Sequence, residues 1–233
     1  MKKNINTITI VIALISVLFV GSITAMFTDA DTATNKFIVG DVSVDIIEEH
    51  WDSEAATDIM PRQEFAKDPK VVNVGKNDAY VFLEVEVPYS QVTIPDHYGV
   101  IPQNPEWVEL LHYDVNVVDW TEMIGDINGT IYPIINQQEG KATHLYAYGS
   151  DTKMTILEKG NNETGTLFDY IQLVNIVEDD DLEGTVLDVT IKAYAIQTLN
   201  INSGDNNIDG INDDGQVSPN DVWNVLSNQR VLI

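Results

Sequence analysis

The residues that could bind a metal or activate water are few in this chain. It has no cysteine and four histidines, which are His50, His97, His112 and His144. None of them lies in an HExxH pattern, the spacing that places two zinc ligands and a general base on one helix face. Glu48-Glu49-His50 is the nearest group of ligand types, and without a second histidine close by it is typical of a polar loop. The pattern predicts no catalytic residue, and we expect that the protein is not an enzyme.

The lack of cysteine also excludes several kinds of site and of scaffold. A thiol nucleophile, a disulfide framework and a Cys-ligated zinc site all require a residue that the sequence does not contain. The sequence also has no Gly-x-Ser-x-Gly elbow and no phosphate-binding glycine loop. Stability must therefore come from an apolar core, which a single β-sandwich of about 200 residues can bury.

An Asp/Asn-rich loop over 201–217 is the better candidate for binding a cation. Read from Asp205, oxygen ligands fall at positions one, three and five with Gly210 sixth, as in a calcium loop, but position twelve is Gln216, a poor ligand. A second register, beginning at Gly210, resembles a dockerin half-site. The weak candidates for Ca²⁺ in the two registers are Asp205, Asn207, Asp209, Asn212, Asp214 and Asp221. The alternative is a solvated loop, and we expect no other cofactor.

The net charge limits the classes of partner. The chain carries 12 basic and 37 acidic residues, a formal charge of −25. Such a surface repels polyanions, so we expect no nucleic-acid partner, and anionic membranes are poor partners as well. Divalent cations, cationic polymers and further copies of the chain, once their charge is neutralised, remain compatible with it.

The amino terminus has the pattern of a secretory signal peptide. Lys2 and Lys3 precede an apolar run over 8–20, which is shorter than the ~20 residues that a spanning helix needs. Small and apolar residues before the junction predict cleavage between Ala25 and Met26. We therefore expect a signal peptide over 1–25, a secreted domain over 26–233 and a formal charge of −27 after cleavage, because two lysines are removed.

The elements that must position any site are strands. Alternation of apolar and polar residues predicts an all-β, antiparallel β-sandwich with long loops. In the strand 79–87, Val81, Leu83, Val85 and Val87 should face the core, and Pro88 should end the strand. The segment 48–67 is interpreted as a loop, and the strand 185–197 as central because it is long. The other expected strands are 37–46, 71–74, 111–120, 130–135, 142–148 and 152–158.

The carboxyl terminus predicts one short helix over 218–228. Ser218 can cap it, Pro219 suits its first position and Asp221 lies in its first turn. Apolar residues then recur at helical spacing around Trp223, which should pack onto the sandwich.

Three different short motifs follow one another along the chain in a characteristic order. They comprise Asn35, Phe37 and Gly40 leading into the first strand, then Lys67, Asp68, Pro69, Asn73, Gly75, Ala79 and Tyr80, and finally Tyr194, Gln197 and Trp223. Together with the signal peptide, they resemble the TasA and camelysin family of exported biofilm-matrix proteins. The resemblance covers both ends of the chain and the second and third strands.

The resemblance implies a jelly-roll-like sandwich that a SipW-type signal peptidase releases outside a bacterium. It also implies assembly into extracellular matrix fibres with further copies and other matrix components. The freed segment 26–36, beginning Met26, Phe27, Thr28 and Asp29, would insert as a donor strand into the next subunit, because an unpaired sheet edge can accept an extended peptide. Because such a contact is head-to-tail, it propagates into a filament. The alternative for this segment is a frayed terminus.

Two further functions stay open at this point. Camelysin is described as a metallopeptidase, so the family also suggests a secreted metalloendopeptidase, which the histidine pattern disfavours. A calcium-binding cell-surface module is the third hypothesis.

Overall fold

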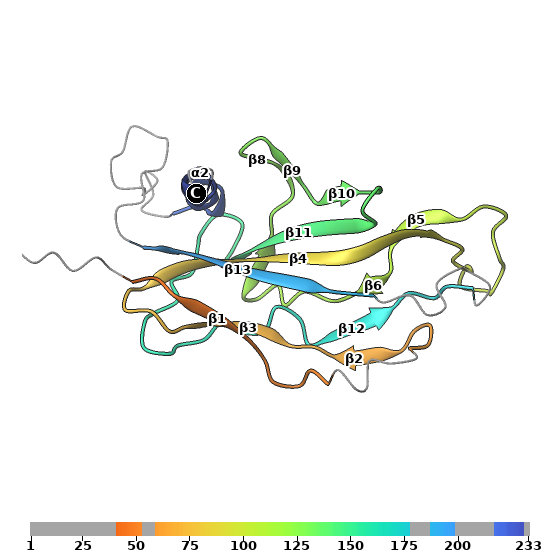
Figure 1. Cartoon of the computed structure of the whole chain (residues 1–233), viewed down its shortest axis with the longest axis horizontal. Helices are drawn as coiled ribbons and strands as arrows, with labels where there is room; N and C mark the ends of the chain where they lie inside the picture. The colour runs from red at the N-terminus through yellow and green to blue at the C-terminus, as the bar shows by residue number, and fades with distance from the viewer. Residues whose placement is uncertain (1–40, 53–58, 178–186, 199–216, 231–233) are drawn as a thin grey trace, which may run out of the picture. The chain divides into compact units, whose positions relative to one another are not determined.

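The computed structural model describes residues 41–52, 59–177, 187–198 and 217–230 (Figure 1). The chain divides into two compact units, Met1–Val39 and Gly40–Ile233. The first unit lies outside the described residues, and with it the predicted signal peptide and donor segment. The second unit is an antiparallel β-sandwich with long loops and one short carboxyl-terminal helix, which confirms the predicted fold class.

Thirteen strands and a helix make up the described part of the second unit. They are β1 (Val44–Glu48), β2 (Glu64–Ala66), β3 (Pro69–Asn73), β4 (Ala79–Val92), β5 (Glu106–Glu109), β6 (Leu111–His112), β7 (Trp120–Glu122), β8 (Gly125–Ile127), β9 (Thr130–Tyr132), β10 (Ile134–Asn136), β11 (Lys141–Tyr148), β12 (Tyr170–Leu173), β13 (Thr190–Gln197) and α2 (Pro219–Arg230). The helix does not meet the length and apolarity that a bilayer span requires.

The larger sheet is built around β4. Its order is β10-β11-β4-β13, with β5 pairing the end of β4 and β7 pairing the end of β11. Every pairing in it is antiparallel. Figure 1 shows β4, β11 and β13 running side by side through the middle of the view.

The opposing layer consists of two small sheets, β1-β3 and β2-β12-β6. A backbone hydrogen bond links the two sheets, because Leu167 N, just before β12, donates to Pro69 O of β3 at 2.8 Å. In Figure 1 these strands lie below the larger sheet. The short β8-β9 hairpin stands apart from both layers.

The main core lies between the two layers. Val81, Leu83, Val85 and Val87 of β4 are fully buried, as predicted. They pack with residues from both sheets, including Phe65, Val71, Leu110, Tyr146, Leu167, Phe168 and Ile171. This face of β4 therefore supplies the centre of the sandwich.

The other face of β4 carries a second core beneath α2. The Phe82 ring packs edge-on against Trp223, with 5.0 Å between ring centroids. Trp223 is also in edge contact with Tyr132 and Tyr194. At the helix start, Asp221 N donates to Ser218 Oγ at 3.2 Å, which is the expected cap. The predicted helix and its tryptophan anchor are confirmed, and Tyr80 and Phe82 are buried on this second face of β4 as well.

Pro88 does not end β4, which continues to Val92. The strand changes partner at this residue, because Glu86 pairs with Thr190 of β13 whereas Tyr89 pairs with Glu109 of β5. Pro88 O still accepts from Leu110 N, at 2.9 Å. Because Pro88 has no N–H to donate, the Leu110 carbonyl accepts a hydrogen bond from Val174 N, at 3.0 Å. A missing N–H is tolerated at such a junction between partners.

Three expected strands are broken by local turns. The strand expected over 111–120 stops at His112, because Asn116 O accepts from Trp120 N and forms a turn. Pro133 separates β9 from β10 within 130–135. The segment 152–158 contributes only isolated bridges at Met154 and Leu157. The predicted loop 48–67, in turn, contains β2.

Candidate functional site

Among the strands that the structure describes, β13 lies at an edge of the larger sheet, and the prediction that it is central was wrong. All eight of its residues pair with β4, from Thr190 opposite Glu86 to Gln197 opposite Ala79. No described strand pairs with its other side. The strand β1 runs alongside it without forming a ladder (Figure 1). The prediction rested on the length of the strand alone. A long strand can also lie at an edge when its partner is longer, as β4 is here.

The hydrogen-bonding direction along β13 follows from one bond just beyond its end. Thr198 N donates to Asp78 O at 3.2 Å and continues the ladder with β4. Because successive residues of an antiparallel strand direct their N–H groups to opposite sides, the odd-numbered residues of β13 direct theirs away from β4. The outer edge thus presents the N–H groups of Ile191, Ala193, Ala195 and Gln197.

The core is incompletely covered along this edge. Ile191, Ala193 and Ala195 belong to the main core cluster but are only half-buried. Their register partners on β4 are Val85, Leu83 and Val81, and each of these is 0% exposed. On the neighbouring β1, Val44 and Ile46 also pack on the core and are half-buried. One more strand at this edge would cover apolar surface as well as pair with the backbone.

Two residues of the family-like motifs hold the start of β1 against the turn after β3. Gly75 N and Val74 N both donate to Ser43 O at 3.0 Å. A Cβ on Gly75 would lie 2.7 Å from Ser43 N and 2.8 Å from Asp41 O, so only glycine allows this approach. Asn73 is fully buried, and its Oδ1 accepts from Gly75 N at 3.0 Å. These residues therefore have a positioning role in the fold.

Five more of the described motif residues are structural as well. Ala79 and Gln197 pair across β4 and β13, and Tyr80, Tyr194 and Trp223 belong to the core beneath α2. Outside the described residues lie Asn35, Phe37 and Gly40, the predicted cut at Ala25 and Met26, and the donor residues Phe27, Thr28 and Asp29.

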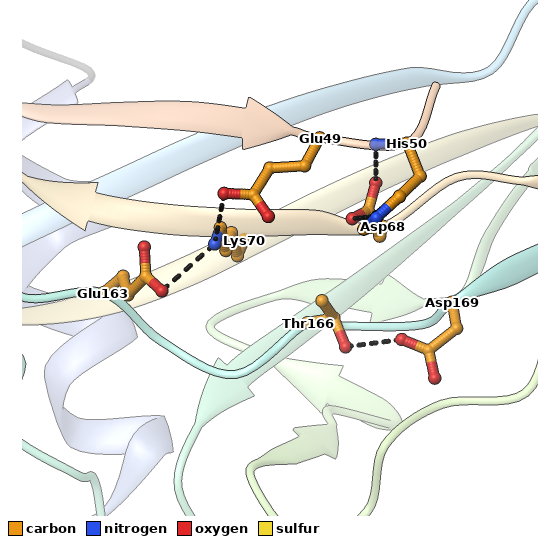
Figure 2. A network of polar contacts seen from close by, with 7 residues as sticks. All are labelled: Glu49, His50, Asp68, Lys70, Glu163, Thr166 and Asp169. Carbon is orange, nitrogen blue, oxygen red and sulfur yellow. Dashed lines mark hydrogen bonds and ion pairs between the residues drawn. The ribbon is translucent and has the colours of Figure 1, made fainter. Parts of the chain in front are cut away.

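A polar network ties the end of β1 to the start of β3 (Figure 2). His50 Nδ1 lies 2.6 Å from Asp68 Oδ2, and His50 N donates to Asp68 Oδ1 at 2.9 Å. Lys70 Nζ bridges Glu49 and Glu163, at 3.0 Å from each carboxylate. The antiparallel register explains the meeting, because Glu48 opposite Pro69 places Glu49 opposite Asp68 one step further.

Charge pairing in this network shifts the pKa of its members. Burial would raise the pKa of the Asp68 carboxyl, but its hydrogen bonds from His50 lower it overall. The hydrogen bond to Asp68 raises the pKa of His50, and hydrogen bonds to Glu49 and Glu163 raise that of Lys70. Next to the network, Lys67 Nζ lies 2.7 Å from Glu48 and 4.3 Å from the centroid of the Trp51 ring.

A second histidine is buried within the sandwich. His144 Nδ1 lies 2.7 Å from Glu122 and its Nε2 lies 3.0 Å from Glu109. Beside it, the hydroxyls of Tyr113 and Tyr146 lie 2.9 Å apart. Burial opposes the charged imidazole, but the two carboxylates outweigh it and raise the pKa of His144 to about 9. Strand alternation over 142–148 places His144 among the polar residues, which is typical of an exposed histidine, and this prediction was wrong.

The structure brings no two of the four histidines into one cluster within its described part. His112 lies 3.4 Å from Asp114, and the His97 ring contacts the Tyr98 ring at a tilt of 45°. Of the calcium candidates only Asp221 is described, and its Oδ2 accepts from Ser218 Oγ at 2.6 Å in the helix cap. Asp205, Asn207, Asp209, Asn212 and Asp214 lie outside the described residues, so calcium binding stays a prediction.

Sequence reasoning missed the group formed by Glu49, His50 and Asp68. The sequence shows both contributing segments, Glu48-Glu49-His50 and the motif Lys67-Asp68-Pro69. The signal that could have predicted their contact is the pairing of β1 with β3, which brings His50 and Asp68, 18 positions apart, together.

No protein-family model matches the chain, and a search of curated proteins finds no significant match either.

Proposed function

We propose that the protein is an exported structural subunit that assembles head-to-tail into extracellular matrix fibres. The segment 26–36 of one copy, released by a SipW-type signal peptidase, adds as a strand to the outer edge of β13 in the next copy. Copies of the same chain and other matrix components are its partners, and it has no catalytic role.

The half-buried core residues of β13 carry this proposal. Ile191, Ala193 and Ala195 face the same core as fully buried residues of β4. An added strand would gain ladder hydrogen bonds with their outward N–H groups and would remove apolar surface from water.

The proposed donor is long enough for this edge. Eleven extended residues span roughly 36 Å at ~3.3 Å per residue, and the eight residues of β13 span roughly 26 Å on the same scale. Phe27 supplies a large apolar side chain that can cover the exposed core. Because one copy donates to the next and receives from the previous one, the contact propagates.

The predicted export fits the composition. The chain has no cysteine and a formal charge of −25, which suits a protein stabilised by its core and kept soluble outside the cell until it assembles. The order of the motifs resembling the TasA and camelysin family points to the same function.

Truncation tests the proposal. Residues 26–233 and residues 37–233 would be purified in parallel and examined by negative-stain electron microscopy and sedimentation velocity. We expect filaments from the longer protein and monomers from the shorter one. Filaments from both would contradict the donor role of 26–36, and monomers from both would contradict assembly. A synthetic peptide of residues 26–36, added to the shorter protein, should bind to it with one-to-one stoichiometry.

A further inference from the structure

Three metal-ligating side chains converge where β1 ends and β3 begins. The ligand atoms of Glu49, His50 and Asp68 all lie within 4.8 Å of one another. Within the described ranges, this is the only group of three or more such side chains that could hold a metal ion. Figure 2 shows Glu49 and His50 leaving the end of β1 and Asp68 meeting them from the strand opposite. The group is unrelated to strand exchange at β13, so it is a second, independent feature.

The distances suit a small divalent cation after a modest adjustment. In a tetrahedral site with metal-to-ligand bonds of ~2.0–2.1 Å, ligand atoms lie ~3.3 Å apart. His50 Nδ1 and Asp68 Oδ2 are now 2.6 Å apart and share a proton, which a cation would replace. The side chains of His50 and Glu49 are 72% and 56% exposed, so both can move to accommodate it.

Asp68 is already oriented as a ligand. Its side chain is only 9% exposed, and its Oδ1 is held by the backbone N–H of His50 at 2.9 Å. This hydrogen bond leaves Oδ2 directed at the imidazole and at the proposed cation. Outer hydrogen bonds of this kind hold the ligating carboxylates of metal sites in place.

When no metal ion is bound, the ammonium group of Lys70 pairs with Glu49, the third proposed ligand. Its Nζ lies 3.0 Å from Glu49 and 3.0 Å from Glu163. A cation must therefore compete with Lys70 for Glu49. The carboxylate of Glu163 would still hold the ammonium group after Glu49 turned away.

We propose that Glu49, His50 and Asp68 form a site for one divalent transition-metal ion of the Zn²⁺ class, which clamps the end of β1 to the start of β3. Imidazole with two carboxylates favours Zn²⁺ or Co²⁺ over Ca²⁺ and Mg²⁺, which prefer oxygen ligands alone. Three protein ligands leave a fourth position to water. The site lies at the sandwich surface and has a structural role.

The test is a titration of the chelator-stripped exported protein with Zn²⁺ by calorimetry and with Co²⁺ by visible absorption. We expect one site, ligand-field bands from bound Co²⁺, and a higher thermal midpoint with Zn²⁺. His50→Gln and Asp68→Asn should each weaken binding by at least about tenfold. Lys70→Met should tighten it several-fold, because the competitor for Glu49 is gone.

His112→Gln is the matched control. His112 is an exposed histidine 3.4 Å from Asp114, without a third ligand, so its loss should leave the affinity unchanged. Circular dichroism of each variant verifies folding before the titration. Equal affinity in the wild type, His50→Gln and Asp68→Asn would overturn the proposal, as would displacement of Zn²⁺ by equimolar Ca²⁺ or weaker binding in folded Lys70→Met.

Discussion

The imidazole of His144 lies between two carboxylates, with its Nδ1 2.7 Å from Glu122 and its Nε2 3.0 Å from Glu109. Glu109 belongs to β5, Glu122 to β7 and His144 to β11, so the charged histidine connects three strands of the larger sheet. The strands β5 and β7 are short, and β5 pairs with β4 alone. The histidine adds an ionic link between these two short strands at opposite margins of the sheet.

This arrangement predicts a loss of stability at alkaline pH. The pKa of His144 is raised from 6.5 to about 9 in the folded protein. A raised pKa contributes stability that is complete below pH 6.5 and is lost as the pH rises through about 9. At 1.36 kcal/mol per unit, the loss is at most about 3 kcal/mol.

Urea unfolding between pH 6 and 10 measures this loss. The free energy of unfolding of the wild type should fall across that range, and that of His144→Gln should fall much less. His112→Gln removes an exposed histidine and should keep the wild-type profile. An identical slope in His144→Gln would contradict the charged-histidine account.

The core beneath α2 predicts a large effect of Trp223→Ala. The side chain is buried and is in contact with Phe82, Tyr132 and Tyr194, so truncation leaves a cavity. We expect a loss of about 3–5 kcal/mol in the free energy of unfolding. Trp107→Ala is the control, since that ring is 39% exposed and stacks on Tyr89 near the end of the larger sheet. Chemical denaturation should show a clearly smaller loss for it, and equal losses would argue against the docking of α2 through Trp223.

The close approach at Gly75 predicts that Gly75→Ala destabilises the protein. The added Cβ would meet backbone atoms of residues 41 and 43 at under 3.0 Å, so the start of β1 must move. We expect a loss of about 1–3 kcal/mol, as for an overpacked core. Gly160→Ala has a positive φ but open space around its Cβ, and it should cost about 1 kcal/mol. Thermal denaturation compares the two, and a cost no greater at Gly75 would refute the steric argument.

Salt should promote assembly of the processed protein. Each copy would carry a formal charge of −27, so copies repel one another until ions screen them. The Debye length falls from about 30 Å at 0.01 M to about 10 Å at 0.1 M. Light scattering should therefore rise earlier at 0.1 M NaCl than at 0.01 M, and residues 37–233 should show no rise at either concentration. Faster assembly at low salt would contradict a contact between like-charged copies.

The fold class followed from patterns that depend on local chemistry. Alternation at Val81, Leu83, Val85 and Val87 placed the core face of β4, and the Ser218 cap placed α2. These patterns work because side chains alternate with period two on a strand and because a helix start requires a cap.

Most of the errors arose where long-range contacts decide the outcome. Pro88 is tolerated because β4 exchanges partners at that residue. The exception is the expected strand 111–120, which a local turn at Asn116 interrupts. His144 was interpreted as exposed because its two carboxylate partners come from other strands. The metal-ligating group at Glu49, His50 and Asp68 depends on the β1-β3 register, which no local pattern specifies.

The most direct test of strand exchange uses one copy that can only donate and one that can only accept. Ala193→Pro removes an outward N–H of β13 and keeps the amino-terminal segment, so it can donate but not accept. Residues 37–233 retain β13 and lack the donor, so they can accept but not donate. Sedimentation velocity of each protein alone and of their equimolar mixture should give two monomers and one heterodimer. Filaments of Ala193→Pro alone, or a mixture that stays monomeric while both proteins are folded, would contradict the account.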